Sequence, residues 1–202
     1  MFVIETIRKG SLYAIKYNNE YDEFENNELE DDQSSKDEFR RLFNNWADTE
    51  YLHAFFDKHN SDLKKEFYNS ISIEDAIFQT IDEAEKLEQT FLEISELGKT
   101  DDTRNLQTLF KPLNKRDEKI YPIPDFQESK VYGSQHKSWL RIYAIRIEKN
   151  VFVVTGGAIK LVQKMDERDH LKKELEKLEQ VKNFLIDKDI ITNVELVEFC
   201  EL

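Results

Sequence analysis

Five basic side chains in the C-terminal part of the chain have the types and spacing to act together on one phosphate group. If the strand expected here continues to Lys164, Lys160 and Lys164 lie on the same side of it, because side chains alternate along a strand. Arg141 lies on the strand expected just before, and Arg168 and His170 lie at the start of the helix expected just after. We therefore expect these five side chains to converge on one anionic site.

Reaction at a phosphodiester needs positive charge around the phosphorus and groups that move protons. Arg141 and Lys160 are suited to hold phosphate oxygens. Lys164 or His170 is suited to be the base or the acid, since histidine titrates near neutral pH and neighbouring cations lower the pKa of a lysine. The alternative for each residue is a solvated surface charge, and for His170 a pair with Glu174, one helical turn away.

The elements expected around these residues define an α+β fold, with a small antiparallel sheet of about four to five strands packed against helices. Apolar residues at helical spacing, each group preceded by a capping side chain, predict helices that begin at Ser35, Thr49, Ser61, Ser72 and Asp166. Alternating and β-branched residues predict strands within residues 2–16, 140–147, 151–155 and 190–199. Gly98 is the expected end of the helix from Ser72, and Gly156-Gly157 permits a β-bulge.

We assign the whole chain, residues 1–202, to one domain. Within it, residues 18–98 are expected to form an acidic loop and a helical insertion, and residues 131–202 the sheet with its closing helix. The stretch from Tyr17 to Ser35 contains eight acidic residues and no basic one, which is typical of a solvated loop.

The charge is unevenly distributed along the sequence. The net charge is −13, yet residues 131–182 contain 11 basic and 7 acidic side chains, a local charge of about +4. The single cysteine, Cys200, excludes an internal disulfide, and four scattered histidines give no pattern of metal ligands. No signal peptide or membrane span is recognisable, so we expect a cytoplasmic protein without a membrane partner.

The basic segment resembles the RelE/HigB family of type II toxins, within the RelE/ParE superfamily. The resemblance lies in Leu140-Arg-Ile-Tyr143, followed by Gly157-Ala-Ile-Lys-Leu-Val-Gln-Lys164 and then an amphipathic helix. The upstream Leu109-Phe-Lys-Pro-Leu113 is similar to the link between the helical hairpin and the sheet of that family. The resemblance in layout covers about 75 residues, and it implies a RelE-like fold.

The resemblance also implies an endoribonuclease that cleaves ribosome-associated mRNA, an mRNA interferase, and an antitoxin protein that neutralises it. Cleavage of RNA by its own 2′-hydroxyl needs a base, an acid and positive charge, so no metal and no small-molecule cofactor are expected. The partners implied are the antitoxin and RNA, together with the ribosome. The residues concerned are Arg141, Lys160, Lys164 and His170 as catalytic candidates, and Arg168, Tyr143 and Arg146 as RNA-binding candidates.

Two other functions remain open at this point. The chain can keep a toxin-like fold and act only as a binding or regulatory module, through protein partners. Alternatively, its acidic helical part can imitate nucleic acid and occupy the site of another protein. A single solvent-open cationic site formed by Arg141, Lys160 and Lys164 would favour the nuclease.

Overall fold

The structure, a computed structural model, describes residues 2–17, 36–65, 71–113, 127–133 and 138–201. In this part of the chain the strands are β1 (Phe2–Arg8), β2 (Leu12–Tyr17), β3 (Lys111–Pro112), β4 (Gln127–Tyr132), β5 (Leu140–Glu148) and β6 (Val151–Ile159). They form one six-stranded sheet in the order β1-β2-β6-β5-β4-β3. Neighbouring strands are antiparallel except β2 and β6, which are parallel.

The α+β class is therefore confirmed, but the expected antiparallel sheet of four to five strands is wrong in two respects. The sheet has six strands and is mixed. The additional strands β3, at the edge of the sheet, and β4, next to it, lie in a polar region where the sequence shows no apolar alternation. The expected acidic loop between Tyr17 and Ser35 lies outside the described residues.

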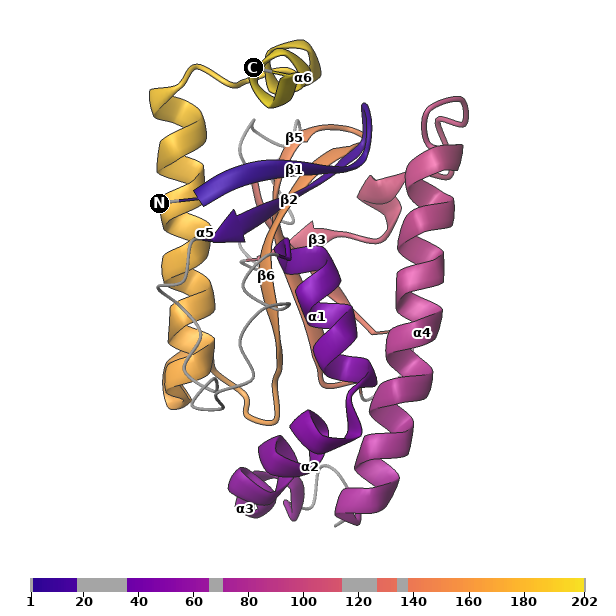
Figure 1. Cartoon of the computed structure of the whole chain (residues 1–202), viewed down its shortest axis with the longest axis vertical. Coiled ribbons are helices and arrows are strands. Elements are labelled where there is room, and N and C mark those ends of the chain that lie inside the picture. Colours follow the sequence, from indigo (N-terminus) through magenta and orange to yellow (C-terminus); the bar gives the residue numbers. More distant parts are fainter. Residues whose placement is uncertain (1, 18–35, 66–70, 114–126, 134–137, 202) are drawn as a thin grey trace.

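Helices cover both faces of the sheet (Figure 1). They are α1 (Glu38–Ala47), α2 (Thr49–Lys58), α3 (Asn60–Leu63), α4 (Ile73–Leu97), α5 (Asp169–Asp187) and α6 (Asn193–Glu201). In Figure 1 α1 and α4 lie on one side of the sheet and α5 on the other. Among the described helices, none combines the length and the apolar character that crossing a membrane requires.

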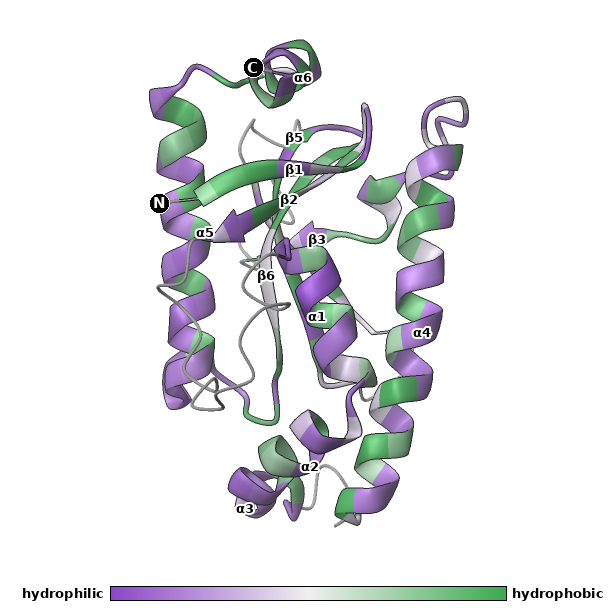
Figure 2. Ribbon diagram, in the orientation of Figure 1, coloured by the Kyte–Doolittle hydropathy of each residue, from purple (hydrophilic) through white to green (hydrophobic). Residues whose placement is uncertain are grey.

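Alternation along the central strands divides the core into two clusters. Ile142 and Ala144 of β5 pack with α1, α2 and α4, whereas Tyr143 and Ile145 pack with α5. The helices of the expected insertion thus share a core with the sheet. Figure 2 shows the amphipathic pattern that allows this, with apolar and polar residues on different faces of α4 and α5.

The helix starts follow local capping rules, although not always at the expected residue. Ser72 caps α4, since its side chain accepts a hydrogen bond from the Asp75 backbone N–H, and Gly98 is the C-cap of that helix, as expected. Asp48, rather than Thr49, caps α2. An aspartate one residue upstream competes successfully for a cap position because its carboxylate also interacts favourably with the helix dipole.

Two expectations about the C-terminal part are wrong. Strand β6 ends at Ile159 and α5 begins at Asp169, so the segment from Lys160 to Lys164 does not continue the strand and Asp166 does not cap α5. Residues 190–199 form no edge strand, since α6 occupies most of this stretch. The sequence Thr192-Asn-Val-Glu195 is a capping box: the Glu195 carboxylate accepts from the Thr192 N–H, and the Thr192 hydroxyl accepts from the Glu195 N–H.

Candidate nucleic-acid interface

Arg141 and Lys160 lie at the same end of the β5–β6 hairpin. The Arg141 guanidinium donates to the carbonyls of Ser138 and Leu140, at 2.9 and 2.7 Å. The Lys160 backbone N–H donates to the carbonyl between those two, that of Trp139, at 2.8 Å. The Lys160 ammonium donates to the carbonyls of Val162 and Gln163, in the loop after β6. Both cations are thus tied to backbone oxygens rather than left mobile.

The surroundings of Lys160 lower the pKa of its ammonium group. Partial burial lowers its pKa below the ordinary lysine value, and the positive charges of Arg141 and Lys130 lower it further. Lys130 is on β4, directly across from Tyr143 of β5, and its ammonium donates to the Leu113 carbonyl at 2.7 Å. Three cations from β4, β5 and the end of β6 are therefore close enough to repel one another.

An exposed tyrosine lies among these cations. Tyr132 pairs directly with Arg141 across β4 and β5, and the guanidinium lies 4.0 Å from the centroid of its ring. The ammonium groups of Lys111 and Lys130 are each 5.7 Å from the same centroid. We call these residues and Lys160 the cationic–aromatic cluster; its members are Lys111, Lys130, Tyr132, Arg141 and Lys160.

Three members of this cluster were not candidates in the sequence analysis: Lys111, Lys130 and Tyr132. The available signal was Lys-Val-Tyr at 130–132, a basic and an aromatic residue two positions apart. That spacing places both side chains on one face of a strand. Recognising its meaning needs the β4–β5 pairing, which brings Tyr132 opposite Arg141.

Arg168 and His170 belong to a second group, which contacts residues of α2 and α3. Arg168 forms two hydrogen bonds with the buried Asp62 carboxylate, at 2.8 and 2.6 Å, and so ties the start of α5 to α3. The His170 Nε2 lies 3.2 Å from the Ile159 carbonyl, and its ring lies 5.0 Å from that of His59. His59, Asp62, Arg168 and His170 form what we call the histidine cluster. The five cations therefore do not meet at one phosphate site, contrary to the expectation from the sequence.

The histidine cluster predicts a pH-dependent stability. Burial, together with the positive charge of the nearby His170, lowers the pKa of His59 from 6.5 to about 4. Burial also lowers the pKa of His170. Because the unfolded chain then binds protons more readily than the folded one, the free energy of unfolding should fall as the pH drops from 6.5 towards 4.

The substitution that tests this is His59→Leu. As the pH is lowered, the free energy of unfolding of this variant should fall less steeply than that of the wild type. Urea unfolding between pH 7 and pH 4.5 measures it, with His53→Leu on the exposed face of α2 as the control. Parallel stability curves for wild type and His59→Leu would show that His59 does not titrate in this way.

The remaining candidates have different surroundings. Tyr143 is 1% exposed, its hydroxyl contacts the Met165 sulfur at 3.1 Å, and burial raises its pKa, so it offers no surface to RNA in this structure. Arg146 donates to the Glu148 carbonyl at the opposite end of β5. Lys164 is exposed, and its backbone N–H donates to Glu167. His170 does not pair with Glu174, which bonds to Lys177 instead.

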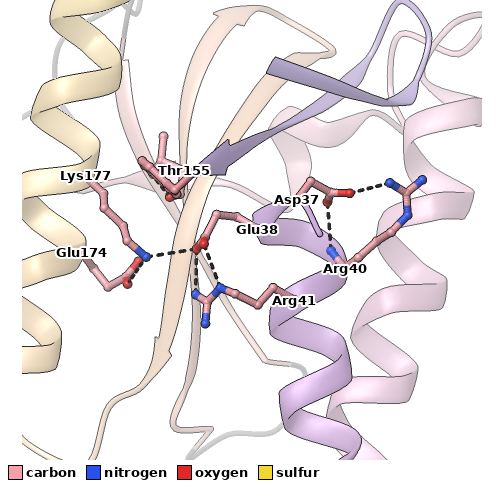
Figure 3. A network of polar contacts seen from close by, with 8 residues as sticks. Asp37, Glu38, Arg40, Arg41, Thr155, Glu174 and Lys177 are labelled. Atoms are coloured by element: carbon pink, nitrogen blue, oxygen red, sulfur yellow. Dashed lines mark hydrogen bonds and ion pairs between the residues drawn. The ribbon is translucent and has the colours of Figure 1, made fainter. Parts of the chain in front are cut away.

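A buried charge network joins α1 to α5 beside β6 (Figure 3). Lys177 donates to Glu38 at 3.2 Å and to Glu174 at 3.1 Å, and Arg41 forms two bonds of 2.8 Å with Glu38. We call Glu38, Arg41, Glu174 and Lys177 the buried charge network. Burial acts to raise the pKa of Glu38, but Arg41 and Lys177 hold it below its ordinary value. Burial raises the pKa of Glu174, whose Oε2 has no hydrogen-bond partner within the described residues.

Beside the C-terminal half of β6, the buried charge network lies where a neighbouring strand would otherwise pair. The described pairing of β2 with β6 stops at Val154, and beyond it the network links Glu38, at the start of α1, to Lys177 of α5 beside β6. Gly156 lies at this point, where a Cβ would come within 2.0 Å of the Glu174 carboxylate. The network thus lies against β6 at Gly156, four residues before Lys160.

The fold and this interface define an α+β protein with a cationic–aromatic cluster on one face of a mixed sheet. Comparison of the chain with family models, curated proteins and solved structures finds no match. Within the described residues, no group of three histidine, cysteine, aspartate or glutamate side chains is arranged to hold a metal ion.

Proposed function

We propose that this protein is a cytoplasmic, RelE/HigB-like toxin of a toxin–antitoxin system that cleaves ribosome-associated mRNA without a metal ion. The observation that supports the proposal most is the gathering of Arg141, Lys130 and Lys160 on a molecule whose net charge is −13. Three cations that repel one another gain stability from an anion between them, and a phosphodiester is such an anion. A divalent cation would be repelled from the same place.

The chemistry follows from the three side chains. Lys160, in its neutral form, accepts the proton of the 2′-hydroxyl, whose oxygen then attacks the adjacent phosphorus. Arg141 and Lys130 stabilise the extra negative charge of the pentavalent phosphorane. The bond from phosphorus to the 5′-oxygen breaks, and water protonates that oxygen. The hydroxide that remains takes the proton from the Lys160 ammonium, which restores water and the neutral amine. The products are a 2′,3′-cyclic phosphate and a 5′-hydroxyl.

The test is inducible expression in bacteria that lack the antitoxin, followed by mapping of mRNA 5′ ends. Wild type should arrest growth and cleave mRNA, and Arg141→Ala and Lys160→Ala should each lower the cleavage rate by roughly 100-fold or more. Lys86→Ala, which removes an exposed cation paired with Asp82 on α4, should cleave like wild type. Intact mRNA and normal growth with the wild-type protein would overturn the nuclease.

The second candidate function is a binding or regulatory module without catalysis. The histidine cluster favours it, because Arg168 is paired with Asp62 and His170 with a backbone carbonyl, away from Arg141. In that case the wild-type protein binds RNA or a protein partner through the cationic–aromatic cluster, and purified protein leaves the RNA uncut.

A further inference from the structure

Tyr132 is placed in a way that its packing alone does not explain. It is 38% exposed and surrounded by three cations from three strands. A cation–π contact at an exposed site is weak, and three cations around one ring repel one another. The cluster is therefore stabilised most by a ligand that has both a negative charge and a flat aromatic surface.

The strand register fixes the shape of this surface. Lys111 pairs with Lys130 across β3 and β4, and Tyr132 pairs with Arg141 across β4 and β5. Neighbouring strands are ~4.8 Å apart, and residues two apart on a strand are about 7 Å apart. Lys111 lies on the outermost strand, two strand spacings from the strand that carries Arg141.

We propose that Tyr132 stacks on a nucleobase of the bound RNA and that Lys111 contacts a phosphate beside that base. The RNA then crosses the sheet from Lys160 towards the outer edge at β3. Stacking needs an unpaired base and is tolerant of its identity, whereas Lys111 contributes a contact that is independent of sequence. This inference rests on the proposed function, because it takes RNA as the ligand of the cluster.

The alternative is that Tyr132 acts only by holding the Arg141 guanidinium in place. The two roles differ in their dependence on the base. Removing a stacking residue lowers the affinity for RNA only when a base is present. Removing a residue that orients Arg141 lowers the affinity for the sugar–phosphate chain as well.

The experiment compares two labelled oligonucleotides of eight residues by fluorescence anisotropy. One is 2′-O-methyl oligouridine, which has no free 2′-hydroxyl and so resists the proposed cleavage, and the other is the same chain without bases. Tyr132→Leu should raise Kd for oligouridine by about 5- to 100-fold and leave Kd for the abasic chain unchanged. Tyr132→Phe should bind like wild type. Lys111→Ala should weaken both complexes and lower the salt dependence by about one ion.

Equal losses on both oligonucleotides for Tyr132→Leu, or no loss on either, would overturn the stacking role. Thermal unfolding confirms that each variant is folded. A parallel assay with unmodified RNA separates the two proposals: if wild type binds with the stacking signature but does not cleave, the nuclease fails and Tyr132 keeps its role. If wild type cleaves and Tyr132→Leu binds normally, only the stacking role fails. If wild type binds neither oligonucleotide and cleaves nothing, both fail.

Discussion

Lys177→Met is expected to destabilise the protein by about 3–5 kcal/mol, the usual cost of removing one partner from a buried ion pair. The side chains of Lys177, Glu38 and Glu174 are 5%, 5% and 7% exposed. Without the ammonium group, Arg41 alone faces two buried carboxylates. Methionine fills a similar volume, so the loss reports the charge and not a cavity.

Thermal and urea unfolding measure this loss, which corresponds to a fall in Tm of roughly 6–20 °C. Lys172→Met, on the same helix but half exposed and paired with the exposed Asp169, is the matched control and should change Tm little. The deficit of Lys177→Met should narrow as the pH is lowered, because Glu174, whose pKa burial already raises, becomes protonated and uncharged. A variant as stable as wild type at pH 7 would show that the network does not hold α1 to α5.

Gly157→Ala is expected to destabilise the protein by roughly 3 kcal/mol and to displace Arg141. A Cβ at Gly157 would lie 2.5 Å from the Arg141 carbonyl oxygen and 2.7 Å from the Leu42 side chain. The carbonyl belongs to the neighbouring strand and cannot turn aside without shifting the β5–β6 ladder. The same shift moves the guanidinium that we assign to the phosphate.

Circular dichroism during urea unfolding measures the stability, and oligonucleotide binding measures the displacement. Gly10→Ala is the control, because Gly10 has φ of 79° but meets only the Asn193 side chain, at 3.8 Å. Its expected loss is about 1 kcal/mol, from backbone strain alone, without a change in RNA binding. Equal losses in the two variants would contradict the proposed close approach of β5 and β6.

The elements of this protein that the sequence predicted best are those with a strong local period. The β5–β6 hairpin, a bulge next to Gly156, where the register shifts between Tyr143 and Ala144, and the start of α4 after Ser72 all agree with the structure. The apolar stripe of α5 is also confirmed, for instance at Leu171 and Leu178, which are buried. Strands β3 and β4 were missed because their residues are polar and their pairing partners lie elsewhere in the chain.

The sequence alone determined where the helices α1, α2, α4 and α5 and the hairpin of β5 and β6 form, and where positive charge concentrates, because helix and strand periods and capping act over a few residues. Only the tertiary structure decided which charges meet. Arg168 pairs with Asp62, 106 positions away, and so does not join the cluster around Arg141. Strand register instead brings Tyr132 and Lys111 to the cluster around Arg141. Five cations that a continuous strand would have gathered are divided because β6 ends at Ile159 and the chain turns there.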